Sequence, residues 1–553
     1  MSGSDNPVTA AIAIAIAVDQ GAQSSRKHTL GNVRLRHQDT NALILIPTPS
    51  QDPNDPLNWP QWRKYYTAAL VCLAMTMSNF LAGGPSIAIV STALSFFPSA
   101  IEDGTLATSA IPKIAYFFTT TSLLQGVGCF VWVPLANKYG RRPVYLASYL
   151  VYFSTALWLI FDKSYDGFLA GRIIMGFGAG AAETIAPITI ADVFFLHERG
   201  AVMSFYNCAL SVGVALGMIV SGLITINHDW RTIYEVSSAL IGFVLVLIFL
   251  TFPETSYRRK PEESEGSITT INVHDDKDSY SRSYNEELSQ SFNTPPPKSP
   301  WRALSVWNGS FTSEGAFKMF LRPFVLILLP PVLWAALVQA VTIGFLVAVS
   351  SNIGAAFDAA YEFEPYKIGL CFASAIVGSL LGIPAGGHFG DKVADYFTQR
   401  NGGIREPEMR LPVMALSMIT TPLALVLYGV GIQHGLHWIV PTIGLGLLNF
   451  SITQAASVSL VYVIDAYRPV AGEVSLAVLG FKSMFGFLLS FYTNPWINIS
   501  GYQNAFGAMA GISASVLVMW IPFYLSGKKI RHVTWHWPVI SYIHWDDDRE
   551  VGE

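Results

Sequence analysis

The chain has 553 residues, of which 51% are hydrophobic and 13% are charged, and its formal net charge is −4. Soluble domains carry about 25% charged residues, so this composition, with a mean hydropathy of +0.40, excludes an ordinary soluble enzyme and a disordered scaffold. The slight negative charge excludes a nucleic-acid binder, and four cysteines without metal-ligand spacing predict neither a disulfide framework nor a metal site. We therefore expect a polytopic membrane protein.

The first 65 residues are polar apart from Ala10–Val18, which is too short to cross a bilayer and has no basic region before it. We predict that residues 1–65 are a cytosolic, largely disordered tail. Asp55–Lys64 ends this tail with two tryptophans and two cations, a composition typical of an interfacial anchor.

Apolar segments long enough to cross a bilayer recur along the rest of the chain. They predict an all-α membrane protein with twelve transmembrane helices in two six-helix bundles, 66–252 and 323–526. Residues 253–322 are predicted to be a central cytosolic linker, because EESEG, DDKDS and PPPK cannot form a core, and 527–553 a cytosolic tail. The predicted spans are 66–94, 111–136, 144–161, 167–190, 201–225, 231–252, 323–350, 366–389, 411–432, 436–464, 472–492 and 502–526.

Lysine and arginine gather in the tails, the linker and the even-numbered loops. By the positive-inside rule both termini face the cytosol, and we expect the plasma membrane. The opposite face carries acidic loops. These loops either attract cationic ligands or only reflect the placement of lysine and arginine on the cytosolic side. Asn498-Ile-Ser500 on that face is a candidate glycosylation site close to a helix end.

The loop after the second helix reads Pro134–Leu146 and contains Gly140-Arg-Arg-Pro. Gly140 permits a tight turn. Arg141 and Arg142 follow it, and their guanidinium groups can bond carbonyls and carboxylates and hold one transport state closed. The alternative is plain positive-inside charge.

The fourth and eleventh helices carry charges inside the membrane. Arg172 and Glu183 share one face of the fourth helix with Gly176 and Ala179. A charge there costs about 2.5–3.5 kcal/mol on insertion scales, so each needs a partner or a wet cavity. Glu183 is predicted to bind a proton or a cationic substrate, or else to make a buried structural hydrogen bond. Lys482 is predicted to bind an anionic group or to pair with a buried acid such as Glu183.

The ends of the fourth and tenth helices form an internal repeat: each has an Asp, a nearby Arg and a Gly before the next helix. Asp192 and Arg199 belong to the first copy, and Asp465 and Arg468 to the second. We favour ion pairs of a cytosolic gate over catalysis here.

The loop after helix 2 keeps Leu135, Lys138, Gly140, Arg141 and Arg142 of the pattern Gly-x-Leu-x-Asp-Arg/Lys-x-Gly-Arg-Arg/Lys. On this motif the chain resembles the major facilitator superfamily over roughly residues 56–526. Val133 and Asn137 depart from the pattern, and the copy at Gly387–Lys392 keeps the glycine and the aspartate but loses the later Gly-Arg-Arg. Asp55-Pro-Leu-Asn-Trp, Ala182-Glu-Thr, Pro253-Glu-Thr and a partial Gly213-x-x-x-Gly217 motif resemble the fungal drug:proton antiporter branch.

Six-plus-six helices with a long central cytosolic loop already suggest two bundles that rock around a central site. The resemblance implies that helices 1, 4, 7 and 10 line the cavity. It associates Arg172 with proton coupling, through the helix 4 pattern Arg-x-x-x-Gly, and Glu183 is the second candidate for proton coupling because of its charge inside the membrane. The candidate substrate-binding residues are Asn79, Glu183, Gln339, Asn449, Gln454 and Lys482. The candidate gating residues are Asn137, Gly140, Arg141, Arg142, Asp192, Arg199, Asp391, Asp465 and Arg468.

The hypothesis that follows is a monomeric secondary transporter without a cofactor, not an enzyme, which exports an amphipathic organic compound such as a drug, toxin or secondary metabolite against protons. No Walker-type phosphate loop is present in the sequence, which argues against ATP drive. Two alternatives stay open: proton-coupled uptake of cations or polyamines, and a nutrient sensor that does not transport.

Overall fold

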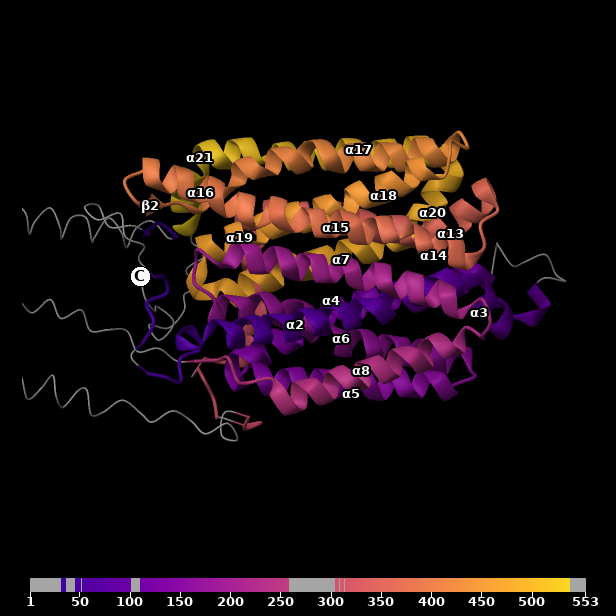
Figure 1. Cartoon of the computed structure of the whole chain (residues 1–553), viewed down its shortest axis with the longest axis horizontal. Helices are drawn as coiled ribbons and strands as arrows, with labels where there is room; N and C mark the ends of the chain where they lie inside the picture. The colour runs from indigo at the N-terminus through magenta and orange to yellow at the C-terminus, as the bar shows by residue number, and fades with distance from the viewer. Residues whose placement is uncertain are drawn as a thin grey trace, which may run out of the picture.

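The computed structural model describes residues 31–35, 45–50, 52–100, 110–257, 304–307, 309–312 and 314–537. In this part of the chain, helices run nearly parallel to one long axis in two adjacent groups (Figure 1). The first group holds residues up to Thr251 and the second begins at Ala316. The predicted disorder of residues 1–30, of 258–303 and of 538–553 lies outside the described residues.

Among its described residues, the first bundle contains seven α-helices and a short connecting turn. These are α2 (Gln61–Gly83), η2 (Gly84–Ala88), α3 (Ile89–Phe96), α4 (Ile111–Tyr139), α5 (Arg141–Phe161), α6 (Tyr165–Val193), α7 (Arg199–Ile224) and α8 (Arg231–Thr251). The short elements η1 (Pro56–Asn58) and η3 (Pro98–Ala100) flank α2 and α3. In sequence order, α2, η2 and α3 together make the first membrane span.

The second bundle has more breaks, many of them at proline. It contains α11 (Ala316–Leu326), α12 (Pro330–Gln339), α13 (Phe345–Tyr361), α14 (Pro365–Cys371), α15 (Ala373–Gly386), α16 (His388–Arg400), η6 (Pro407–Val413), α17 (Met414–Gln433), α18 (Ile439–Ser451), α19 (Ser457–Ala466), η8 (Arg468–Val470), α20 (Ala471–Val518) and α21 (Trp520–Trp535). Two π-helical turns, η5 (Ala340–Gly344) and η7 (Ile452–Ala456), interrupt its seventh and tenth spans.

Eleven helical segments among the described residues are long and apolar enough to span a membrane, and the last, Arg468–Trp535, has 68 residues. A helix of that length would be far longer than a bilayer core of about 30 Å. Gly501 divides it, because its backbone leaves the helical region at φ 76° and ψ 163°. The predicted twelve-helix fold follows from this division.

Helix boundaries differ from the prediction at the seventh span, which runs Pro330–Tyr361 instead of 323–350. Pro330 and Pro331 start the helix, since proline suits its first turn. The predicted end at 350 was wrong, because α13 continues to Tyr361. Asn352 lies in this extension, where its amide donates a hydrogen bond to Asn494 Oδ1 at 2.9 Å.

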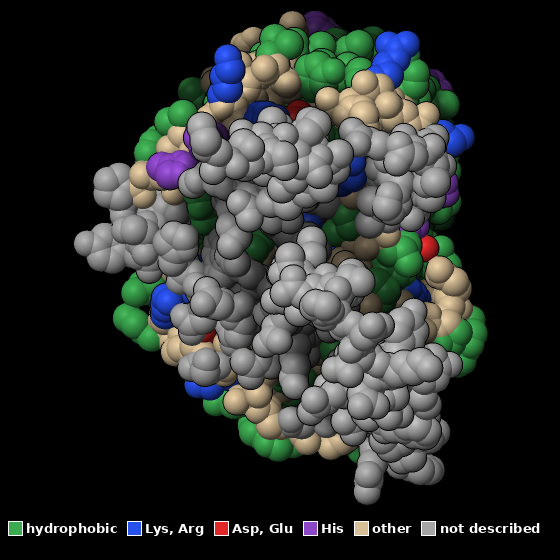
Figure 2. Space-filling view, turned by 90° about the vertical axis from the view of Figure 1, so that its left-hand side faces the viewer, with side chains coloured by type: hydrophobic (Ala, Val, Ile, Leu, Met, Phe, Trp, Pro, Cys, Tyr) green, Lys and Arg blue, Asp and Glu red, His purple; other side chains and the backbone are tan. Residues whose placement is uncertain are grey.

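Parts of the predicted tails are also ordered. α2 begins at Gln61, and α21 continues to Trp535. Before α2, Leu35 and Ile46 are buried, and β1 (Val33–Arg34) pairs antiparallel with β2 (Ile404–Arg405). Residues 31–35 and the end of α21 lie together, as the 3.2 Å bond from Arg531 Nη2 to Asn32 Oδ1 shows; we call this the termini end. Figure 2 looks onto it, and Lys and Arg side chains are visible around its rim.

Glycines bring the helices of the first bundle into close contact. A Cβ at Gly178 of α6 would lie 2.8 Å from the backbone nitrogen of Tyr152 in α5, and one at Gly213 of α7 would lie 2.5 Å from the carbonyl oxygen of Thr76 in α2. The Gly213-x-x-x-Gly217 motif thus lies at a tight contact between α7 and α2, since only glycine lets these backbones approach so closely.

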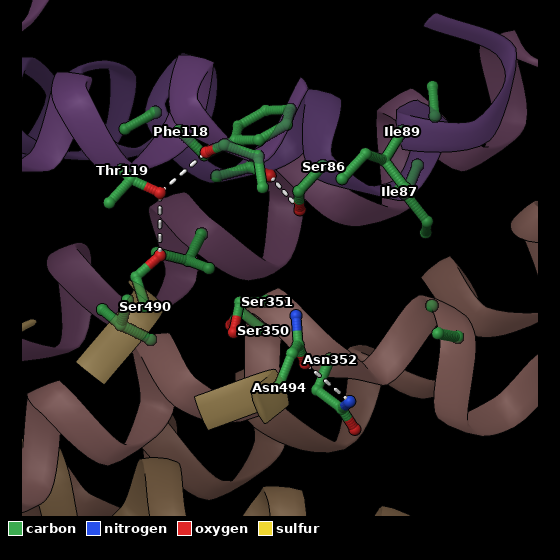
Figure 3. Close-up of a pocket in the computed structure, with 18 of the residues that line it drawn as sticks. Ser86, Ile87, Ile89, Phe118, Thr119, Ser350, Ser351, Asn352, Ser490 and Asn494 are labelled. Carbon is green, nitrogen blue, oxygen red and sulfur yellow. Dashed lines mark hydrogen bonds between the residues drawn. The ribbon is translucent and has the colours of Figure 1, made fainter. Parts of the chain in front are cut away.

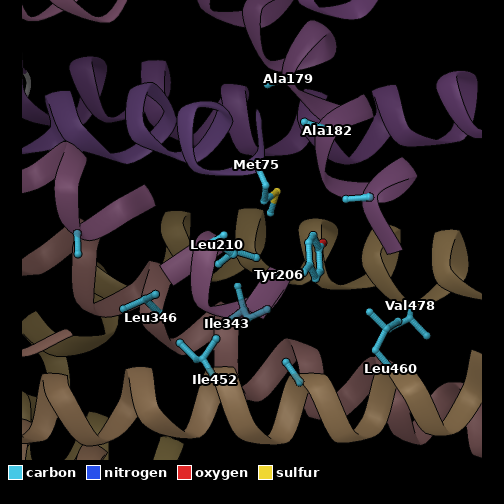
Figure 4. Close-up of a cluster of buried hydrophobic side chains, with 14 of the residues drawn as sticks. Met75, Ala179, Ala182, Tyr206, Leu210, Ile343, Leu346, Ile452, Leu460 and Val478 are labelled. Atoms are coloured by element: carbon cyan, nitrogen blue, oxygen red, sulfur yellow. The ribbon is translucent and has the colours of Figure 1, made fainter. Parts of the chain in front are cut away.

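The hydrophobic core continues from one bundle into the other. Met75, Tyr206 and Leu210 of the first bundle belong to the same buried cluster as Ile343 and Ile452 of the second (Figure 4). At the two sides of this contact α4 packs against α20, and α7 packs against α14 and α15. These two seams are the most extensive contacts between the bundles.

Gly128 offers a test of this packing. A Cβ at Gly128 of α4 would lie 2.6 Å from the carbonyl oxygen of Phe177 in α6, whereas one at Gly507 of α20 has nothing within 4 Å. We expect Gly128→Ala to destabilise the fold by about 1–3 kcal/mol through overpacking. The unfolding midpoint in detergent should fall for Gly128→Ala and stay unchanged for Gly507→Ala; equal midpoints would contradict the packing.

Candidate functional site

A cavity of about 1320 Å³ lies between the two bundles. Its walls come from η2, α3 and α4 of the first bundle and from α13, α14 and α20 of the second. Figure 3 shows Ser86, Phe118 and Thr119 facing Ser350, Asn352 and Asn494 across it. The lining includes Asp229, Glu364 and Asn498 from connections and helix ends at the pole opposite the termini end, so the cavity opens there.

Glu183 of α6 and Lys482 of α20 meet at the wall of this cavity. The Lys482 ammonium makes an ion pair with Glu183 Oε1, and Gln125 Nε2 of α4 donates to Glu183 Oε2 at 3.1 Å. All three residues line the cavity, and the two charged side chains are almost fully buried. The ion pair predicted as one option for Lys482 is confirmed, and it joins the two bundles.

Small residues place this carboxylate. A Cβ at Gly126 of α4 would lie 2.5 Å from Ser483 Cβ of α20, so α4 and α20 touch beside the pair. The hydroxyl of Tyr206 donates to the Glu183 backbone carbonyl at 2.7 Å. Both carboxylate oxygens of Glu183 thus have donors, which offsets much of the cost of burying the charge.

Arg172 lies fully buried elsewhere, outside the cavity lining. Its guanidinium donates to the carbonyl oxygens of Phe117 at 3.1 Å, Leu81 at 3.1 Å and Ala82 at 3.4 Å. In a regular helix the Leu81 carbonyl would accept from the N–H of residue 85, but Pro85 has none. Arg172 therefore replaces the hydrogen bond lost at the break between α2 and η2.

The structure brings together three of the six predicted substrate-binding residues. Asn79, Glu183 and Lys482 line the cavity. Gln339, Asn449 and Gln454 are buried within the second bundle instead: Gln339 donates to the Ala456 carbonyl at 3.0 Å, Asn449 to its own helix at Leu445, and Gln454 to the Val413 carbonyl at 2.9 Å.

Several polar cavity residues were missed in the sequence. Asn352 bonds Asn494 between α13 and α20, and the hydroxyls of Thr119 and Ser490 lie 3.3 Å apart across the bundle seam. Serine and threonine in membrane helices commonly bond their own backbone, so their spacing alone carried no signal. The asparagines were visible as polar residues at the ends of predicted spans.

At the termini end, ion pairs lie where the sequence placed a gate. Arg199 Nη1 of α7 lies 3.6 Å from Asp465 Oδ1 of α19, which links the two bundles. Arg141 Nε lies 3.1 Å from Asp192 Oδ2 within the first bundle, and Arg141 Nη1 donates to Asn137 Oδ1 at 3.0 Å. Asn137 thus accepts a bond from Arg141 even though it has no charge.

The second-bundle copy of the motif forms a matching cluster. Asp391 of α16 pairs with Arg410, and Arg405 lies 4.0 Å from the same oxygen. Burial lowers the pKa of Arg405 to about 10, so it remains charged at neutral pH. Gly200 of the first bundle lies against this pair, because a Cβ there would collide with both Asp391 and Arg410. The predicted gating residues of the two halves therefore meet at one interface.

The role of Glu254, in the Pro253-Glu-Thr segment, is not visible in the sequence. Glu254 accepts from the backbone N–H of Arg141 at 2.9 Å and of Arg142 at 3.2 Å. A carboxylate is favourable at these orphan N–H groups and at the positive helix end. Gly140, at φ 102°, leaves room for it, since a Cβ would meet the Glu254 carboxylate. Arg142 donates to the carbonyls of Phe249 and Phe252.

Two other predicted residues, Arg468 and Asn498, lie at opposite ends of the molecule. Arg468 donates to the carbonyl oxygens of Asp465 at 3.3 Å and Gly31 at 3.2 Å. Asn498 lies in α20, shortly before the break at Gly501, and lines the cavity at its open pole. Its glycosylation stays a prediction.

Residues 68–475 match the family model described as Major Facilitator Superfamily. The chain is 26% identical over 529 residues to an uncharacterized MFS-type transporter of Schizosaccharomyces pombe, covering 89% of this chain and 88% of that protein. It is 24% identical over 496 residues to the efflux pump FUBT of Fusarium oxysporum, covering 88% and 76%.

Among solved structures, the chain is similar to the proton:xylose symporter XylE bound to 6-bromo-6-deoxy-D-glucose. The TM-score is 0.55 at 17% sequence identity, and the match covers 84% of this chain and 96% of that one. At this identity the likeness concerns the fold alone.

The Glu183–Lys482 pair predicts a strongly non-additive double-mutant cycle. Removing one partner of a buried pair costs about 3–5 kcal/mol because the other charge stays buried and unpaired. We expect Glu183→Gln and Lys482→Met each to lower the unfolding midpoint in detergent. The double variant should lose much less stability than the two single losses added together. Additive losses would show that the two side chains do not interact.

Proposed function

This chain belongs to the major facilitator superfamily, and we propose that, as a transporter of that family, it exports an amphipathic organic compound in exchange for protons. The observation that carries this proposal is the buried Glu183–Lys482–Gln125 group at the wall of a large cavity between the bundles. On the positive-inside rule we place the termini end in the cytosol and the open pole of the cavity outside, at the plasma membrane.

The proton and the substrate would compete for Glu183. Protonation removes the negative charge that Lys482 faces and leaves a buried cation without its partner. The ion pair that joins α6 to α20 is then lost, and separation of the bundles with entry of water would relieve the lone charge. Deprotonation restores the pair. A titration at this one carboxylate is thus coupled to the contact between the two halves.

The cavity wall fits an amphipathic compound. Ile87, Phe118 and Leu346 offer apolar surface, and Ser86, Ser351 and Asn494 offer hydrogen-bonding groups in the same space. Binding sites of this composition hold a ligand through apolar contact and orient it through a few polar groups. The printed name of the Fusarium oxysporum relative, an efflux pump, supports export as the direction.

Arg172 is not proposed as the proton carrier. Its three carbonyl partners favour a role in holding the bend between α2 and η2, and η2 forms part of the cavity wall. Substitution of Arg172 would then disturb the shape of the site more than its proton chemistry.

The second candidate is uptake of organic cations or polyamines, and one observation favours it. Lys482 is the only lysine or arginine among the described residues that line the cavity, whereas five carboxylates line it: Glu183, Asp229, Asp358, Glu362 and Glu364. A cavity of this charge concentrates cations.

Purified protein in liposomes, with an imposed pH gradient and a panel of cations and hydrophobic toxins, tests both proposals. We expect gradient-dependent flux of an amphipathic compound, and we expect Glu183→Gln to abolish its dependence on the gradient, because the glutamine cannot titrate. Glu235→Gln in α8 makes the same chemical change at an exposed position and should leave the flux unchanged.

Three outcomes separate the alternatives. Saturable inward flux of labelled spermidine, lost in Glu183→Gln, would favour cation uptake over export. No gradient-dependent flux of any compound would overturn both, and would favour a sensor. Unchanged proton coupling in Glu183→Gln would move the coupling site away from this carboxylate.

A further inference from the structure

Two short segments before α2 lie across the closed, termini end of the molecule. They are residues 31–35 and 45–50, which we name the N-terminal clasp. We propose that the clasp is a conformational restraint: it holds the two bundles together at the termini end and so favours the state whose cavity opens at the opposite pole. This role is independent of the substrate and of proton coupling.

The first segment is bound to the second bundle. β1 pairs with β2 in the register Val33 to Arg405 and Arg34 to Ile404, and the Leu35 N–H donates to the Gly403 carbonyl at 2.8 Å. β2 lies in the connection between α16 and η6, so this contact ties the clasp to the eighth and ninth spans.

The same segment is also tied to the last spans. The Gly31 carbonyl accepts from Arg468, and Asn32 accepts from Arg531, which is itself held by both oxygens of Glu408 at 2.7 and 2.9 Å. Gly31 has a φ of 85°, and a Cβ there would lie 3.0 Å from Ala466 at the end of α19. The segment therefore requires glycine to lie this close to the tenth span.

The second segment is bound to the first bundle. The Ile46 carbonyl accepts from the N–H of Leu196, in the connection between α6 and α7, at 2.8 Å. Leu35, Ile46 and Leu196 form a separate buried cluster, exposed by only 1%, 4% and 2%. Leu35 thus belongs to a segment held by the second bundle, while its side chain is buried against a residue of the first.

The clasp lies next to the ion pair that crosses the bundle interface. Arg468, which bonds Gly31, also bonds the Asp465 carbonyl, and the Asp465 carboxylate pairs with Arg199 of α7. Opening the termini end separates α7 from α19 and Leu196 from β2. Either the β1–β2 ladder or the Leu35 cluster must then break, and exposure of Leu35 to water opposes that change.

The test uses Leu35→Asp, which places a charge in the apolar cluster, with Leu45→Asp as the matched control, because Leu45 is 40% exposed in the same clasp. The four native cysteines are buried, so a single reporter cysteine can be followed with a membrane-impermeant maleimide in detergent. Ser86→Cys reports on the cavity, and Ser204→Cys, fully buried at the bundle interface, reports on the termini end.

We expect Leu35→Asp to slow labelling at Ser86→Cys and to speed labelling at Ser204→Cys, each by about tenfold for a ratio of the two states that moves from about 10:1 to about 1:10. Leu45→Asp should label like the protein without a clasp substitution. Equal labelling of the Leu35→Asp and Leu45→Asp proteins at both reporters would overturn the proposal.

A cross-link distinguishes opening from misfolding. Ser204 and Ser457 have hydroxyl oxygens 2.8 Å apart across the interface, so Ser204→Cys with Ser457→Cys should form a disulfide that holds the termini end closed. In the Leu35→Asp protein this disulfide should restore rapid labelling at Ser86→Cys. Failure to restore it would mean that the substitution damaged the fold, and the proposal would be rejected. Neither readout involves transport, so the outcome is separate from that of the flux assay.

Discussion

One buried ion pair constrains the whole molecule. Glu183 and Lys482 belong to different bundles and meet where neither charge could be left alone at an acceptable cost. Their contact requires α4 and α6 to lie close to α20, and Gly126 and the glycines of α6 allow that approach. This contact lies at the wall of the cavity and beside the α4–α20 seam, so it adds a charge pair to the apolar contact between the halves.

The rule that a buried charge needs a partner also explains three other buried cations. Arg172 replaces an N–H group that Pro85 lacks, Arg142 binds carbonyls at the end of α8, and Arg322 is held by Glu314 and Glu473. A guanidinium group carries several donors in one plane, so it can satisfy helix ends and carboxylates at once. Charge is thus concentrated where the backbone or a second charge requires it.

Much of the fold was predictable because the bilayer imposes length and hydropathy on each span. The twelve helices followed from the length and hydropathy of the spans. The need of Glu183 and Lys482 for partners followed from the free-energy cost of a charge in the bilayer. The positions of Gln339, Asn449 and Gln454 could not be predicted in this way. Hydropathy assigns a residue to a span, but it does not say whether that side of the helix faces the cavity or the interior of its own bundle. Glu254 was missed because its capping role depends on a contact between α5 and the end of α8, far apart in sequence.

The π-helical turns η5 and η7 are places where the seventh and tenth spans can rotate one part of the helix relative to the other. A π turn holds one residue more than an α turn, so its loss would rotate the helix beyond it by about 100°. Gln339 directly precedes η5, and Gln454 lies inside η7. The two amides now packed inside the bundle lie beside the two places where a helix can change register, so the set of side chains facing the cavity need not be the same in each state of the cycle.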